Sequence, residues 1–188
     1  MPGALTRPLL GLTVVAALCA GCGGEDAKAT DKSSSETSLT LVCASGDLAV
    51  TTGRVMSVSS QPFVAVELRN EGRQRCAIEG YPRVTADGVS AGGRTGVLAV
   101  REKHGDLYER KDPGRQLVLL EPGEAAVFHV GTSTAYDVGT QTITQLRIHL
   151  PDVRGRLTVP LQLEASRPPM RRIPLGVTAL QHEDDVLQ

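Results

Sequence analysis

The chain has 188 residues, 40% of them hydrophobic and 22% charged, with 20 lysines and arginines against 21 aspartates and glutamates. This balance excludes a long disordered or coiled-coil protein, and the lack of a basic excess argues against nucleic acid as a partner. With 20 glycines, 11 prolines and only 3% aromatic residues, the composition predicts many turns and an aliphatic core.

The first 21 residues have the features of a bacterial lipoprotein signal peptide. Arg7 precedes a short apolar run, Leu9–Leu18, which is too short for a transmembrane helix of about 20 residues. The small residues before Cys22 resemble the lipobox of bacterial lipoproteins, which implies cleavage after Gly21 and a lipid on Cys22. That pattern prefers Leu three residues before the cut, where this chain has Cys19. Simple secretion is the alternative to anchoring at the extracytoplasmic face of the membrane.

A flexible tether is predicted next, from the lipidated Cys22 to residue 38. Residues 23–38 contain no large apolar side chain and therefore cannot bury a core. A β-sandwich domain is expected over residues 39–180. The acidic residues 181–188 are expected to form a frayed tail.

Short runs of alternating apolar residues fill residues 39–180 and predict an all-β sandwich or barrel. They are separated by turn signals, of which Glu121-Pro122-Gly123-Glu124 fits a type II turn because Gly accepts a positive φ. The period-2 apolar positions are Leu48, Val50, Val64, Val66, Leu68, Leu117, Leu119, Ala126, Phe128, Val130, Leu146, Ile148, Leu150, Leu157, Val159, Leu161, Leu163, Ile173, Leu175 and Val177.

Two cysteines, Cys43 and Cys76, fall inside the predicted domain. Export would place them in a compartment that permits disulfides, so we expect a bond between them. The alternative is a metal site, which would need further ligands because zinc takes four.

The order of motifs around these cysteines resembles the actinobacterial secreted and lipoprotein family called domain of unknown function 4232. The motifs are Cys43, Leu68-Arg69-Asn70-Glu71-Gly72, Cys76, Gly80-Tyr81-Pro82 and Leu119-Leu120-Glu121-Pro122-Gly123. The resemblance implies an immunoglobulin-like antiparallel β-sandwich with Cys43–Cys76 as its bridge. It implies no known chemistry, so no catalytic residue is carried over. We interpret Tyr81-Pro82 as the conformational entry to a strand, with a binding role as the less favoured alternative.

Residues 88–92 match G-x-S-x-G, which would make Ser90 the nucleophile of a secreted serine hydrolase. That motif needs a strand, the serine and then a helix, so that the hydroxyl is exposed beside an oxyanion hole. Here a Gly-rich stretch and the apolar run Val97–Val100 follow, which favours a hairpin loop. Asp112 and His129 follow Ser90 in the order Ser–Asp–His, but such an order arises easily by chance in a chain of this length.

No metal or cofactor site is predicted from the histidines. His104, His129, His149 and His182 are far apart in sequence. The strand pattern turns His129 and His149 toward solvent. A small-ligand or metal carrier would need two histidines to converge with Met56 or Met170.

The segment Arg101–Arg115 is the most highly charged stretch of the domain and is expected to be a solvated loop. As a recognition loop on a rigid scaffold, it would contact an envelope protein or polymer through Arg101, Tyr108, Arg110 and Arg115, residue types that are frequent at binding hot spots. A second, smaller basic cluster contains Arg167, Arg171 and Arg172.

These observations favour a non-catalytic envelope lipoprotein, held at the membrane by its lipid. The serine hydrolase and the small-ligand or metal carrier are the alternatives.

Overall fold

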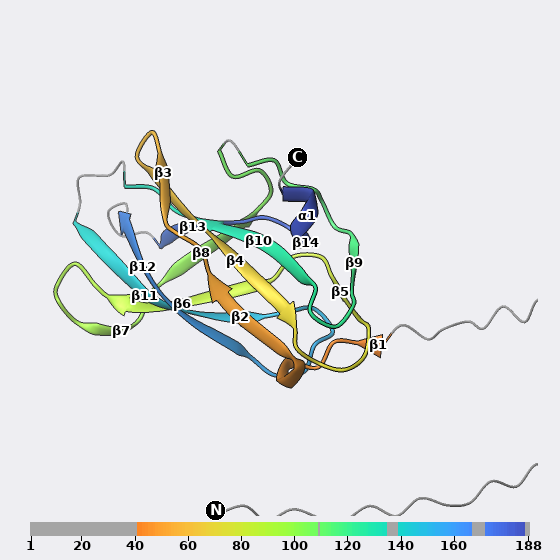
Figure 1. Cartoon of the computed structure of the whole chain (residues 1–188). Coiled ribbons are helices and arrows are strands. Elements are labelled where there is room, and N and C mark those ends of the chain that lie inside the picture. Colours follow the sequence, from red (N-terminus) through yellow and green to blue (C-terminus); the bar gives the residue numbers. More distant parts are fainter. Residues whose placement is uncertain (1–40, 109, 135–138, 167–171, 187–188) are drawn as a thin grey trace, which may run out of the picture. The chain divides into compact units, whose positions relative to one another are not determined.

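The computed structural model describes residues 41–108, 110–134, 139–166 and 172–186. These residues belong to one compact unit and are almost entirely β (Figure 1). Their helical content is a 3-10 turn, Ser45–Asp47, and a four-residue helix, α1, Glu183–Val186. No helix in the described ranges is long and apolar enough to cross a membrane.

The largest sheet has seven strands. Its main path runs in the order β2 (Leu48–Thr52), β4 (Gln61–Asn70), β10 (Ala125–Gly131), β13 (Ile173–Val177) and β8 (Val100–His104). Two short strands join it at the side, β3 (Met56–Val58) on β4 and β14 (Gln181–His182) on β10. All pairs are antiparallel except β13 with β8.

Two smaller sheets complete the described strands. One has the order β12 (Leu157–Ser166), β11 (Thr140–His149), β6 (Arg83–Val89) and β7 (Thr95–Val97). The other joins β1 (Leu41–Val42) in parallel to β5 (Cys76–Glu79), which pairs with β9 (Leu117–Leu120). The fold is thus the predicted all-β sandwich, with two parallel pairs that alternation alone does not predict.

The core is formed by the two larger sheets (Figure 1), and the three-stranded sheet adds Cys76, Ile78, Val118 and Leu120 to it. Along β4 from Val64 to Leu68, and along β12, every second residue is apolar and buried, because successive side chains of a strand point to opposite faces. The buried positions on these strands and on β10, β11 and β13 include Val64, Val66, Leu68, Ala126, Phe128, Val130, Leu146, Ile148, Leu157, Val159, Leu161, Leu163, Ile173, Leu175 and Val177.

The apolar face of β9 is the opposite of the one expected. Val118 and Leu120 are buried, whereas Leu117 and Leu119 are 58% and 39% exposed. All four residues of the strand are apolar, so alternation does not select a face. The pairing with β5 selects it: Val118 and Leu120 lie opposite Ile78 and Cys76, which are themselves buried.

The C-terminal segment is not frayed over its described part. Gln181 and His182 pair with β10, and α1 lies against the same strand. Acidic and basic side chains pair in this segment. The Glu183 carboxylate lies 3.5 Å from the Arg69 guanidinium, and the Glu124 carboxylate lies 3.4 Å from the His182 Nε2. The expectation of a free acidic tail is therefore wrong for residues 181–186.

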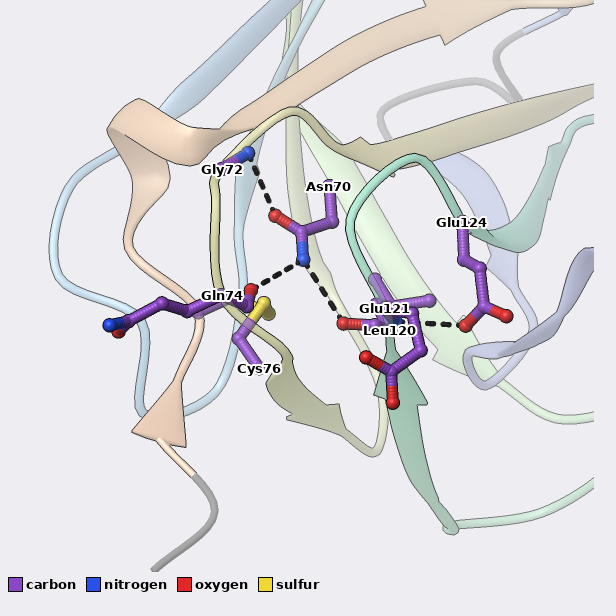
Figure 2. Close-up of a disulfide and its surroundings, with 8 residues drawn as sticks. Asn70, Gly72, Gln74, Cys76, Leu120, Glu121 and Glu124 are labelled. Atoms are coloured by element: carbon purple, nitrogen blue, oxygen red, sulfur yellow. Dashed lines mark hydrogen bonds between the residues drawn. A yellow bond between two sulfur atoms is a disulfide. The ribbon is translucent and has the colours of Figure 1, made fainter. Parts of the chain in front are cut away.

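A disulfide joins Cys43 to Cys76 beside a buried asparagine (Figure 2). The Asn70 side chain is inaccessible to solvent. It donates to the carbonyls of Gln74 (2.9 Å) and Leu120 (3.0 Å), and accepts from the Gly72 N–H (2.9 Å). One amide thus ties the loop before Cys76 to β9.

The turn at Glu121–Glu124 is held at the same end of the sandwich. The Gly123 N–H donates to the Asn70 carbonyl (2.7 Å), and the Asn70 N–H donates to the Glu124 carbonyl (2.9 Å). Gly123 has φ 90°, as the predicted type II turn requires. The motifs that carry the family resemblance, except Gly80-Tyr81-Pro82, therefore meet around Asn70 and the disulfide, where they have a structural role.

Candidate binding site

Ser90 lies in the hairpin turn between β6 and β7, as predicted, and a strand rather than a helix follows it. Its hydroxyl accepts from the Arg94 N–H at 3.2 Å, and its backbone bonds to Gly93 and Arg94. These contacts close the turn. Within the described residues, no hydrogen bond joins Ser90 to Asp112 or His129.

His129 is not solvent-facing, contrary to the expectation, because only 2% of it is exposed. It does point away from the core between the sheets, but other residues cover that outer face. Its ring lies 6.2 Å from the Phe63 ring, over which the Arg110 guanidinium sits at 5.8 Å. Burial, together with the nearby charge of Arg110, lowers the pKa of His129 to about 4. His149, by contrast, is exposed as expected.

The segment Arg101–Arg115 is not one continuous loop. Its first four residues belong to β8, which pairs with β13. The loop, residues 105–116, folds back over the outer face of the seven-stranded sheet, as far as its described residues 105–108 and 110–116 show. Leu107 anchors it and is 4% exposed. A Cβ added at Gly131 or Gly176 would come within 2.8 or 2.6 Å of Leu107, so these two glycines make the space that Leu107 fills.

The four residues proposed for partner binding have separate surroundings. Arg101 is exposed on β8. Tyr108 is 38% exposed and donates to the Thr132 carbonyl at 2.9 Å. Arg110 covers Phe63, as described above. Arg115 pairs with Glu79 at 2.6 Å, and that ion pair raises the pKa of Arg115.

A cavity of about 370 Å³ brings Arg115 together with residues from distant parts of the chain. It lies at the β5–β6 connection, the end of β8 and the turn after β11. The lining residues are Gly80, Tyr81, Arg83, His104, Arg115, His149, Leu150 and Pro151. This volume is in the range of small-molecule sites.

Two stacked rings form part of the cavity wall. The rings of Tyr81 and His104 are nearly parallel, 11° apart, with centroids separated by 4.5 Å. The Tyr81 hydroxyl donates to Asp112, and this bond raises the pKa of Tyr81. Asp112 also accepts from the Ala179 N–H at 2.7 Å. Asp112 therefore holds the hydroxyl end of the Tyr81 side chain. The following Pro82 restricts the Tyr81 backbone.

The charged side chains of the cavity are basic, and no lining residue is acidic. Within the described residues, Arg83 has no hydrogen-bonding or ionic side-chain partner. The partner of Arg115 is Glu79. The His149 Nε2 accepts from Arg156 at 3.3 Å, so Arg156 adds a positive charge beside the wall.

Within the described residues, two histidines and a methionine, the set expected of a metal carrier, do not converge. His104 and His149 do line one cavity, but Met56 lies on β3, and Met170 lies outside the described residues. No group of three or more metal-ligating His, Cys, Asp or Glu occurs in the described part of the chain. Cys22, Arg167 and Arg171 also lie outside it, while Arg172 is exposed.

Sequence reasoning missed the cavity. For Tyr81-Pro82 the sequence favours a conformational role over a binding one, and this pair does lead into β6 as predicted. The sequence places His104 only within the charged, solvated segment. The parallel pairing of β8 with β13 places His104 at the end of the seven-stranded sheet, and no local pattern predicts such a pair.

Comparison with protein families matches residues 43–181 to a family described as a domain of unknown function (DUF4232). The match covers well over half of the chain, so the protein belongs to this family. No curated protein matches the chain.

Proposed function

We propose that this protein is a non-catalytic lipoprotein of the cell envelope. A lipid on Cys22 holds it at the extracytoplasmic face of the membrane, and its β-sandwich binds a ligand or an envelope partner. The observation that carries the proposal is the cavity beside Tyr81, because its wall combines stacked rings and basic side chains. Small-molecule sites commonly combine aromatic side chains with a few polar or charged groups.

The Cys43–Cys76 bond supports the proposed location. Disulfides persist in oxidising compartments and are rare in the cytosol. The bond is 2% and 6% exposed at its two cysteines, so it is part of the packed domain. This agrees with the signal sequence predicted for the first 21 residues.

The surroundings of Ser90 support a non-catalytic reading. A serine hydrolase needs a nucleophile, a base within hydrogen-bond reach and donors for the oxyanion. The Ser90 hydroxyl accepts from the backbone of its own turn. His129 is enclosed on the outer face of β10 beside Phe63. Ser90→Ala should therefore leave ester or amide hydrolysis by the purified protein at background, and a loss of measurable hydrolysis would contradict the proposal.

Membrane fractionation of cells that express Cys22→Ala tests the anchor. We expect this variant to leave the membrane fraction or to accumulate as an unprocessed precursor, because it has no thiol to carry the lipid. Cys19→Leu is the matched control, since it restores the residue that the lipobox prefers and keeps Cys22. The anchor is refuted if Cys22→Ala remains membrane-bound and normally processed.

A further inference from the structure

We infer that the cavity beside Tyr81 binds a small organic anion that carries a flat ring. This rests on the proposed binding function and specifies its ligand class. The anionic group would lie against Arg83 and Arg115, and the ring against the stacked Tyr81 and His104.

The charge of the cavity is the reason for proposing that the ligand carries an anionic group. Arg83 and Arg115 carry guanidinium groups, which are cationic donors, and none of the lining residues is acidic. Beside the two rings, the Glu102 carboxylate lies 3.6 Å from the His104 Nε2 and Asp112 accepts from the Tyr81 hydroxyl, so the cationic side of the cavity is the one with Arg83 and Arg115. Glu79 neutralises part of the Arg115 charge. Arg83 has no such partner in the described chain, so its guanidinium is free to form the two parallel hydrogen bonds that carboxylates and phosphates accept.

The apolar part of the cavity wall is the reason for proposing that the ligand carries a flat ring. Tyr81 and His104 stack at 4.5 Å, and Leu150 and Pro151 provide further apolar surface. Aromatic side chains favour offset-stacked or edge-to-face contacts with a ligand ring. Because Asp112 holds the Tyr81 hydroxyl, the tyrosine is already ordered before a ligand arrives, and less entropy is lost on binding.

Four probes separate these requirements when the full chain is titrated in detergent and backbone amide resonances are followed by NMR. Phenyl phosphate and benzoate carry both ring and anion, inorganic phosphate only the anion, and benzyl alcohol only the ring. We expect the ring-bearing anions to bind about tenfold or more tightly than either single-feature probe. The shifts should concentrate at Gly80, Tyr81, Arg83 and Leu150. Tighter binding of phenyl phosphate than of benzoate identifies a phosphate ligand, and the reverse order a carboxylate.

Three variants test the assignment of roles. Arg83→Gln should weaken phenyl phosphate binding about tenfold, the loss expected for a charge-assisted hydrogen bond. Arg73→Gln, which removes an exposed arginine outside the cavity, should leave binding unchanged. His104→Ala should weaken phenyl phosphate binding but not inorganic phosphate binding, a difference that a merely structural role would not produce.

The inference is overturned if benzyl alcohol binds as tightly as phenyl phosphate. It is also overturned if no probe shifts the cavity amides, or if Arg73→Gln weakens binding as much as Arg83→Gln does. These outcomes remove the cavity as the ligand site. They do not bear on the lipid anchor or on the absence of catalysis by Ser90, because fractionation of Cys22→Ala and the hydrolysis assay of Ser90→Ala test those separately.

Discussion

Asn70 shows how one side chain can organise an end of the sandwich. Its amide is fully buried and has three backbone partners, on Gly72, Gln74 and Leu120. Neither Asp nor Ser could reproduce this set, because Asp lacks the two N–H donors and Ser is too short to span the partners. The L-x-N-x-G motif of this chain is therefore explained by folding.

Replacing Asn70 with Ala should lower the free energy of unfolding by about 3 kcal/mol, because it leaves buried backbone groups without partners. Urea denaturation followed by circular dichroism measures the change. Gln74→Ala is the control, since Asn70 bonds to the Gln74 carbonyl and not to its exposed side chain. Equal stabilities of the two variants would contradict the role assigned to Asn70.

The burial of His129 predicts that the folded protein loses stability in acid. Its pKa is about 4 in the folded protein, below the value of about 6.5 expected in the unfolded chain. The unfolded state therefore binds the proton more readily, and stability is lost as the pH falls from about 6.5 toward 4. We expect this residue to account for a loss of about 2–3 kcal/mol between pH 7 and pH 4.5.

Unfolding free energies at several pH values test the titration of His129. In His129→Gln the pH dependence should become shallower over this range, because glutamine has no proton to gain. His149→Gln, at an exposed position, should keep the wild-type dependence. The account fails if the His129→Gln profile follows that of the wild type.

At the scale of elements, the loop 105–116 determines what the outer face of the large sheet can do. Leu107 fits over Gly131 and Gly176, and Arg110 covers Phe63. The loop therefore converts an exposed sheet face into a second buried layer, which encloses His129. Because Tyr108 and Arg110 make contacts within the fold, their replacement by Ala would change the fold as well as any binding. Tyr108→Phe, which removes only the hydroxyl that bonds to Thr132, is the milder test.

A double-mutant cycle tests the packing of this loop. Gly176→Ala should lower the free energy of unfolding by about 1–2 kcal/mol, because its Cβ would overlap Leu107. In the background Leu107→Ala the same substitution should cost less than about 0.5 kcal/mol, since the side chain it meets is gone. Thermal or urea unfolding of the four proteins gives the coupling, and additive losses would mean that the contact does not exist.

The disulfide also acts at this scale, since it closes the chain between β1 and β5. Its cysteines are 33 residues apart, so replacing both by Ala should lower the free energy of unfolding by about 3–4 kcal/mol. Urea denaturation of the variant, against the oxidised wild type, measures the loss. An unchanged midpoint would show that the bond contributes nothing to stability.

The sequence predicts elements well where alternation is unambiguous. In most of β12, and from Val66 to Arg69 in β4, polar and apolar residues alternate, so one face is identified. In β9 the residues Leu117–Leu120 are all apolar, and the choice of face depends on β5. The burial of His129 likewise depends on a loop that returns from another part of the chain. The cavity gathers residues 80–83, 104, 115 and 149–151, and no spacing within a single segment could reveal it.

At the scale of the whole molecule, the sandwich presents its structural and binding features in different places. Most of the family motifs surround Asn70 and the disulfide (Figure 2). The cavity contains Gly80 and Tyr81 of the remaining motif, together with His104 and residues after β11. Substitutions in the cavity can therefore change ligand recognition while the packing around Asn70 persists. In the proposed function, the tether over residues 22–38 leaves this domain outside the membrane while its lipid remains inserted.

Intact-protein mass spectrometry of the membrane-extracted protein tests this account most directly. We predict a chain that begins at Cys22, carries the added mass of a diacylglyceryl group, and gains two hydrogens on reduction of Cys43–Cys76. A chain that retains the first 21 residues, or one that starts elsewhere without lipid mass, would contradict it.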